Sequence, residues 1–406
     1  MRRLNNCIAL AVLVFATIGA APSANDWTMA RKSPDLNAVA NSLVQELQWR
    51  TPLTDGTNST PVIGDNKVFV DGNGHVLWTL DLYTGKVLWQ SLAGNELSGV
   101  PLLYHGRVIV SQGKPGGAGE NGIAALDAAT GDQLWYQPLS GSGTPTPAIV
   151  DGVLINHDSG GTVEAYDPNS GNQLWERQIQ THAHASAITP IGNANFVTAG
   201  DDPDEVLAMN ARKKNVLWKT AFPHNARSVG SSYLAFDGAR VFGGYFLPSQ
   251  ATSAAQYKAQ QRLYAIDAKN GRMVWTTTVA TGTVNERFLT NMPLLIGETI
   301  FTGSPLTPRF AAYNAKTGAR LWSTTLDAPA SHGSVGKAGV IYVPTQSGTI
   351  YAIDGKTGKM LGHQRMPDVF TDTSPAIAGD SLIIGGNHGY VFAIPLKELR
   401  GDGASH

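Results

Sequence analysis

The chain has 406 residues, of which 15% are charged, and its formal net charge at pH 7 is −1. A nearly neutral chain produces no strong long-range field, so neither nucleic acid nor anionic lipid is an expected partner. The 45 glycines and 22 prolines indicate many tight turns, which is typical of a fold built from short strands.

Residues 1–24 are predicted to be a signal peptide. Arg2 and Arg3 precede an apolar run from Ile8 to Ile18, and small residues follow it, with cleavage expected near residues 21–24. An N-terminal anchor helix is the alternative, but the apolar run is short for a membrane span. We therefore expect a periplasmic or secreted protein.

Cys7 is the only cysteine of the chain. It lies before the apolar run, whereas a lipoprotein cysteine would follow it, so we expect no lipid anchor. Once the leader is removed, the chain has no thiol. It can then form no disulfide, thiolate metal site, cysteine nucleophile or CxxCH haem attachment.

After a lead-in segment at residues 25–43, one phrase recurs between residues 44 and 396 every 40 to 57 residues. In each copy a Trp follows an Asp or Asn at an interval of eight residues. The pairs are Asp81 and Trp89, Asp127 and Trp135, Asp167 and Trp175, Asn210 and Trp218, Asp267 and Trp275, and Asn314 and Trp322. A seventh copy begins at Asp354 and has Gly362 in place of the Trp.

The repeated residues are interpreted as structural. The opening Asp or Asn accepts hydrogen bonds from backbone amides two residues further on, which starts a turn. A Gly then takes the left-handed backbone conformation, except in the fourth copy, which has Lys213 and Lys214. The Trp is expected to wedge between neighbouring units, and a ligand-stacking platform is the alternative. The glycines are Gly85, Gly131, Gly171, Gly271, Gly318 and Gly358.

Each copy contains four short runs in which apolar and polar residues alternate, as in half-buried strands. Four strands in a repeat of this length predict an all-β protein, a β-propeller of four-stranded blades. Seven units are complete, and the eighth lacks its outer strand. The segment VQELQWRTPL, which contains Trp49, should supply it and give eight blades. Seven blades plus a hairpin is the alternative, and residues 397–406 are expected to be a C-terminal tail.

From Trp27 to Leu396 these residues resemble the PQQ-like repeat, whose pattern is A-x-D-x-x-T-G-x-x-x-W. The resemblance implies one of two branches. Quinoprotein dehydrogenases bind pyrroloquinoline quinone (PQQ) and calcium above the ring, and many carry an adjacent cysteine pair that this chain lacks. BamB-like proteins are shorter periplasmic propellers that assist outer-membrane protein assembly, and they fit the length better. The missing lipoprotein cysteine departs from the BamB pattern.

Loops that enter the first strand of each blade should gather at one mouth of the ring. They place there Asn58, Ser98, Thr144, His184, Ser231, Thr290, Ser331 and Asp372, with Arg227, Arg287 and His332 nearby. The candidates for binding a cofactor or a small polar ligand are His184, Arg227, Arg287, His332 and Asp372. The alternative is a solvated funnel whose hydroxyls pair with backbone and water. His182 and His184 are too few ligands for zinc, so no metal site is predicted.

Two further segments are candidates for contact with a partner. Asp201, Asp202, Asp204 and Glu205 form an acidic hairpin tip that lacks the spacing of a calcium loop. Ser253 to Gln261, rich in Ala, Gln and Lys, is expected to form a short helix or to stay mobile. The alternative for this second segment is a tolerated surface insertion.

No G-x-S-x-G, HExxH or Walker motif is present, so no catalytic residue is predicted. The leading hypothesis is a monomeric, non-enzymatic scaffold that binds a protein partner in the cell envelope, BamB-like in outer-membrane protein assembly. Its strand edges would accept an extended segment of the partner. The alternatives are a PQQ-dependent oxidoreductase without the usual cysteine pair, and a sensor of a small ligand or glycan.

Overall fold

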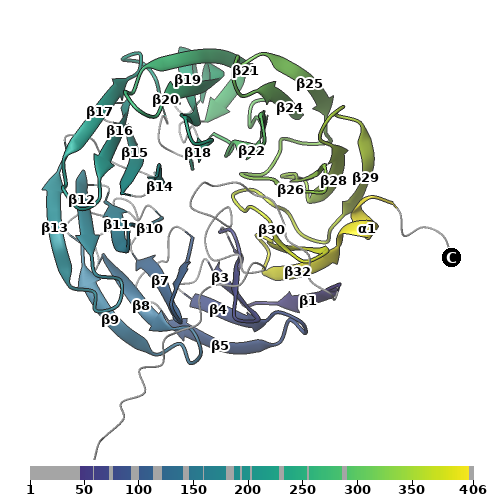
Figure 1. Cartoon of the computed structure of the whole chain (residues 1–406). Helices are drawn as coiled ribbons and strands as arrows, with labels where there is room; N and C mark the ends of the chain where they lie inside the picture. The colour runs from purple at the N-terminus through teal and green to yellow at the C-terminus, as the bar shows by residue number, and fades with distance from the viewer. Residues whose placement is uncertain are drawn as a thin grey trace, which may run out of the picture.

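The computed structural model describes residues 46–57, 59–72, 76–92, 100–112, 121–139, 146–158, 160–179, 187–192, 194–201, 204–227, 233–253, 256–285 and 290–401. The predicted signal peptide, Cys7 and the lead-in segment lie outside these ranges. The described strands form eight four-stranded sheets, and the sheets stand around a central axis as the blades of a propeller (Figure 1).

Blades 1 to 4 each use four consecutive strands, paired in chain order from the axis outward. Blade 1 contains β2 (Val62–Gly64), β3 (Lys67–Gly72), β4 (Val76–Asp81) and β5 (Val87–Leu92). Blade 2 contains β6 (Leu102–Tyr104), β7 (Arg107–Gln112), β8 (Gly122–Asp127) and β9 (Gln133–Pro138). Blade 3 contains β10 (Ala148–Val150), β11 (Val153–His157), β12 (Thr162–Tyr166) and β13 (Gln173–Gln178). Blade 4 contains β14 (Thr189–Pro190), β15 (Asn195–Asp201), β16 (Asp204–Asn210) and β17 (Val216–Ala221).

Blades 5 to 7 follow the same order. Blade 5 contains β18 (Ala235–Phe236), β19 (Arg240–Ser253), β20 (Gln256–Asp267) and β21 (Met273–Asn285). Blade 6 contains β22 (Leu294–Ile296), β23 (Thr299–Gly303), β24 (Arg309–Asn314) and β25 (Arg320–Thr325). Blade 7 contains β26 (Val335–Lys337), β27 (Val340–Pro344), β28 (Thr349–Asp354) and β29 (Met360–Arg365).

Blade 8 joins the two ends of the described chain. It contains β30 (Ala376–Ala378), β31 (Ser381–Gly385), β32 (Tyr390–Pro395) and, as its outer strand, β1 (Trp49–Pro52). β1 is antiparallel to β32, with Trp49 opposite Ala393 and Pro52 opposite Tyr390. The predicted eight-bladed propeller, closed by the N-terminal strand, is therefore confirmed, and the seven-bladed alternative is wrong.

Burial follows the position of a strand in its blade. All five residues of β12 are buried, whereas the outer strand β13 is mostly exposed. Inner strands are covered on both faces because blades pack face to face, and one apolar cluster joins Leu294, Tyr342, Ile383 and Val68 of four successive blades. The core of the protein therefore lies between the blades, as expected for sheets stacked around an axis.

Blade 5 is longer than the others. β19, β20 and β21 have 14, 12 and 13 residues, and Gln256 to Gln261 pair with strands on both sides. The prediction of a short helix is wrong for the described residues Ser253 and Gln256 to Gln261, which lie in β19 and β20. Ala259 and Gln261 are buried while Lys258 and Gln260 between and beside them are not, so the segment has the period of a strand. Pairing on two sides overrides its helical composition.

The C-terminal end of the described chain packs on blade 7. Helix α1 (Leu396–Leu399) follows β32, and Leu399 is fully buried. A side chain at Gly362 would collide with Leu399 and Arg400, because a Cβ there would lie 2.5 Å from the Leu399 carbonyl oxygen. Blade 7 lacks its closing Trp because the first residues of the predicted tail cover that place. α1 is the one helix of the described ranges, and none of them contains a helix long and apolar enough to cross a membrane.

Candidate functional site

The ring has two different ends, which we call the turn end and the mouth. The turn end holds the repeated Asp-to-Trp phrase between the third and fourth strands. The mouth holds the connections between blades and the hairpins between second and third strands, because successive strands alternate in direction. The hairpin of β19 and β20 and the acidic tip between β15 and β16 therefore lie at the mouth.

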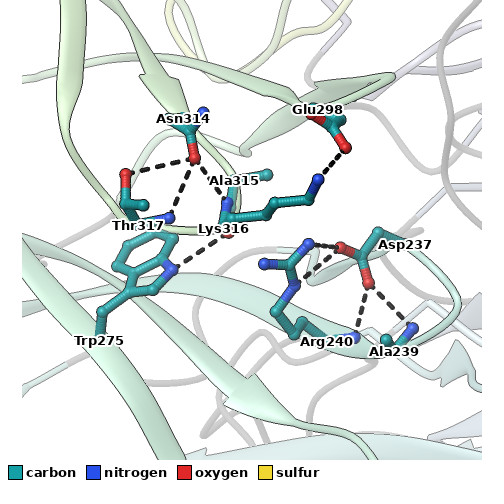
Figure 2. A network of polar contacts seen from close by, with 9 residues as sticks. All are labelled: Asp237, Ala239, Arg240, Trp275, Glu298, Asn314, Ala315, Lys316 and Thr317. Carbon is teal, nitrogen blue, oxygen red and sulfur yellow. Dashed lines mark hydrogen bonds and ion pairs between the residues drawn. The ribbon is translucent and has the colours of Figure 1, made fainter.

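At the turn end the repeated residues build a joint between successive blades, except between blades 7 and 8, where Gly362 replaces the Trp. Figure 2 shows the joint of blades 5 and 6, where the Trp275 indole donates to the Ala315 carbonyl at 3.1 Å. Asn314 Oδ1 accepts the backbone N–H groups of Lys316 and Thr317 at 2.9 and 3.0 Å. Gly318 has φ of +72°, and a Cβ there would lie 2.6 Å from the Trp275 ring. A glycine is thus required for two reasons: the backbone has a left-handed conformation, and a side chain would collide with the Trp275 ring.

The same joint recurs around the ring. Indole N–H groups donate to a carbonyl of the following blade from Trp49, Trp135, Trp175, Trp218, Trp275 and Trp322. Trp89 packs on Gly131 without such a bond. In blade 4, Lys214 takes the left-handed conformation with φ of 49°, so the turn survives the loss of its glycine. All seven closing Trp side chains contact the following blade.

Side chains that precede different blades meet beneath the mouth. The hydroxyls of Thr146, which precedes blade 3, and Tyr233, which precedes blade 5, share a hydrogen bond. This contact links two blades that are not neighbours. Val100 and Met292 belong to the same buried apolar cluster as Tyr233.

The described candidates at the mouth differ in burial and in hydrogen bonding. Ser331 is buried and its hydroxyl donates to the Thr373 carbonyl at 2.6 Å, while Thr290 is buried. Asp372 and Arg227 are exposed, and the Arg227 backbone bridges to Phe246 of β19. The other predicted members lie outside the described residues: Asn58, Ser98, Thr144, His182, His184, Ser231 and Arg287.

His332 and the acidic tip also have defined places. His332 is half-buried and its carbonyl accepts the Met292 N–H at 2.8 Å. Asp201 and Asp204 face each other in the hairpin, and Asp202 lies outside the described residues. Glu205 is only 6% exposed and pairs with Lys219 at 2.8 Å. Glu205 thus belongs to the blade rather than to a free acidic surface.

Sequence analysis missed a buried carboxylate at the mouth. Asp368 is 3% exposed, and its Oδ1 accepts the N–H groups of Val369 and His388 at 2.7 and 2.9 Å. The His388 ring lies 3.3 Å away. Gly386 leaves the room for this carboxylate, since a Cβ there would overlap it. The only local signal was the short GNHG turn of blade 8.

A bound quinone and calcium ion would need a cluster of metal ligands. Nowhere in the described ranges do three or more His, Cys, Asp or Glu side chains gather as metal ligands. Arg227 and Asp372 at the mouth are exposed, and the buried Asp368 carboxylate accepts backbone N–H groups. The described residues by themselves do not supply a calcium site, so no chemical step is assigned to the group.

Comparison with known proteins gives a family and several relatives. The family model described as "Outer membrane protein assembly factor BamB" matches residues 38–231, 159–290 and 259–398. Tetrathionate hydrolase of Acidithiobacillus ferrooxidans is 25% identical, over 93% of this chain and 80% of that protein. The outer membrane protein assembly factor BamB of Burkholderia pseudomallei is 24% identical, over 94% of this chain and 96% of its own.

The fold is also found among solved structures. The quinohaemoprotein alcohol dehydrogenase of Comamonas testosteroni superimposes with a TM-score of 0.68, over 92% of this chain and 80% of that chain. Its sequence is 12% identical, so this likeness concerns the fold alone. A propeller scaffold of this kind carries different functions.

Proposed function

Because this chain belongs to the family described as outer membrane protein assembly factor BamB, we propose that it is an exported, monomeric scaffold that binds protein partners in the cell envelope. Its proposed place is the periplasm, and its proposed role is non-enzymatic assistance to outer-membrane protein assembly. The BamB relative supports this role because the similarity covers nearly the whole of both chains.

The outer edge of blade 5 is the observation that carries the proposal. β21 has 13 residues, whereas the outer strands of the other blades have six or, in β1, four. It is the last strand of its sheet, so one of its edges has no ladder partner. Its sequence, MVWTTTVATGTVN, contains no charged residue. Proteins usually protect long edges with charges or Pro, so an unprotected edge is a template for pairing with another chain.

We infer that a partner adds an extended segment to β21. Backbone hydrogen bonds would give affinity, and alternate side chains would give specificity. The rigid ring supports this mode because the Trp218 and Trp275 joints at the turn end fix blade 5 to blades 4 and 6, so the edge of β21 is already ordered.

The test adds charge to this edge and measures binding to the purified outer-membrane assembly complex. Thr278 and Thr283 lie opposite Arg262 and Lys258 of β20, so the double variant Thr278→Glu/Thr283→Glu keeps favourable cross-strand pairs. We expect the dissociation constant to rise at least tenfold. Gln90→Glu, on the exposed outer strand β5, is the control and should bind normally. Equal binding by all variants would reject β21 as the pairing edge.

A second candidate function is enzymatic, and the similarity to tetrathionate hydrolase over 93% of this chain favours it. The test is the consumption of tetrathionate by the purified protein, followed by titration with PQQ and calcium. The scaffold proposal expects neither turnover nor saturable cofactor binding. Turnover that persists in the Thr278→Glu/Thr283→Glu variant would establish an activity separate from partner binding.

A further inference from the structure

The gap between blades 5 and 6 holds a cavity of about 200 Å³, which extends to Ser304 and Thr307 of the hairpin between β23 and β24 at the mouth. Val279, Ala280 and Thr281 of β21 form one wall, and the facing side of blade 6 forms the other. The first wall exists only because β21 continues beyond the six-residue length of other outer strands. Gly282 brings this extension close to blade 6, since a Cβ there would lie 3.0 Å from the Leu306 carbonyl.

A small side chain on blade 6 leaves the space open. Ala311 lines the cavity and lies three residues before Asn314, which opens the turn of blade 6. The equivalent residues of blades 1, 5 and 7 are Trp78, Tyr264 and Tyr351. Where these blades fill the space with an aromatic ring, blade 6 has only a methyl group. Interiors are normally packed to high density, so a gap of this size is a distinct feature.

Positive charge lines this cavity. Arg309 and Arg320 both face it, and its lining contains no acidic residue. Neither guanidinium has an ion-pair partner within the part of the chain that the structure describes. At the position of Arg320, two residues before the closing Trp, six other blades carry uncharged residues. These are Val87, Gln133, Gln173, Val216, Met273 and Met360.

Two buried hydroxyl groups of the cavity have no hydrogen-bond partner among the described residues. Tyr313 is 1% exposed and its hydroxyl forms no hydrogen bond with the described residues, and the same holds for the Thr307 hydroxyl. Burial raises the pKa of Tyr313, and the positive charge of Arg320 only partly opposes this. The phenol therefore keeps its proton at neutral pH and can donate it. A buried donor without an acceptor is costly, and a bound acceptor would remove that cost.

We propose that this cavity binds a small dianionic oxyanion of sulfur or phosphorus. Guanidinium groups bind such oxygens with two parallel hydrogen bonds, so Arg309 and Arg320 would hold the anion from the rim. Tyr313 and Thr307 would donate to its inner oxygens. This site is independent of partner pairing at β21, although the extension of β21 forms its wall.

The experiment is calorimetric titration of the purified protein, at low ionic strength in a buffer without oxyanions, with sulfate, thiosulfate, tetrathionate and phosphate. We expect saturable one-to-one binding of at least one of them. Arg320→Gln should weaken it at least tenfold, and it should fold because two other blades carry Gln there. Tyr313→Phe should weaken binding several-fold. Arg272→Gln, an exposed change of equal charge just before β21, should bind as the unchanged protein does.

The result separates the sources of the ligand. Preference for thiosulfate or tetrathionate would assign sulfur oxyanions, and preference for phosphate would assign phosphorus oxyanions. The proposal is overturned if none of the four anions saturates, or if Arg320→Gln and Arg272→Gln weaken binding equally. Binding of sulfate, thiosulfate or phosphate is measured without a protein partner and without tetrathionate, so this outcome is independent of both functions considered above.

Discussion

The joint between blades 5 and 6 and the joint between blades 6 and 7 share one end and differ at the other. At the turn end, Trp275 and Trp322 donate to Ala315 and Gly355 at 3.1 and 3.0 Å, with a glycine under each ring. Above these joints, Tyr351 and its neighbours fill the gap between blades 6 and 7 as part of a continuous core. Between blades 5 and 6 the gap stays open beside Ala311. The repeat thus standardises one end of each joint and leaves the other end free to specialise.

Removing a joint at the turn end should have the largest effect and should be similar for both pairs of blades. Trp322→Ala and Trp275→Ala are each expected to lower the free energy of unfolding by about 3 kcal/mol, because a large ring and its hydrogen bond are lost. Urea denaturation followed by circular dichroism measures this change. A loss in Trp275→Ala well below that in Trp322→Ala would mean that the cavity already weakens the joint of blades 5 and 6.

Blade 3 extends the comparison, because it carries a carboxyl group, Glu164, at the position equivalent to Ala311. Burial raises the pKa of Glu164 to about 8. The hydrogen bond from Asn156 lowers this pKa, whereas the negative charges of Asp158 and Glu176 raise it further. A raised pKa means that the folded state holds the proton more tightly than the unfolded state does. Stability is then fully present below the ordinary pKa of about 4.5 and is lost as the pH rises toward 8.

The expected slope of the unfolding free energy over that range is at most about −1.4 kcal/mol per pH unit, the value for one linked proton. Glu164→Gln should remove this contribution, while Glu298→Gln, a change at an exposed ion pair with Lys316, should keep it. Urea denaturation at several pH values between 5 and 8 gives the slopes. A slope that survives in Glu164→Gln would show that another group is responsible.

The two faces of β24 give the smallest and sharpest test. Ala311 faces the cavity, whereas Ala312 belongs to the filled core shared with blade 7. Ala311→Leu is expected to raise the free energy of unfolding by about 1 kcal/mol and to abolish oxyanion binding, because it fills the open space. Ala312→Leu should lower the free energy of unfolding by about 2 kcal/mol through overpacking. Thermal unfolding and anion titration of both variants measure these effects. If the gap were already filled, both variants would lower the free energy of unfolding.

The repeat made the fold predictable from sequence, whereas most of the site was not predictable. Asp, Gly and Trp act through contacts with residues a few positions away or one blade along, so their spacing reports them directly. The contact between Thr146 and Tyr233 is different, because these residues precede blades 3 and 5, which are not neighbours. The spacing of these two residues in the sequence does not predict their contact.

The sequence by itself therefore determined the number of blades, the closure by β1, the turns and the Trp joints, because each rests on a local and repeated pattern. Only the tertiary structure shows that the strands of blade 5 are extended, that α1 occupies the place of a Trp beside Gly362, and that Arg320 and Tyr313 line a cavity. These features depend on what lies opposite a residue in another blade. The open space beside Ala311 also depends on the extension of β21 in blade 5, and no pattern along the chain reports which residues lie opposite each other.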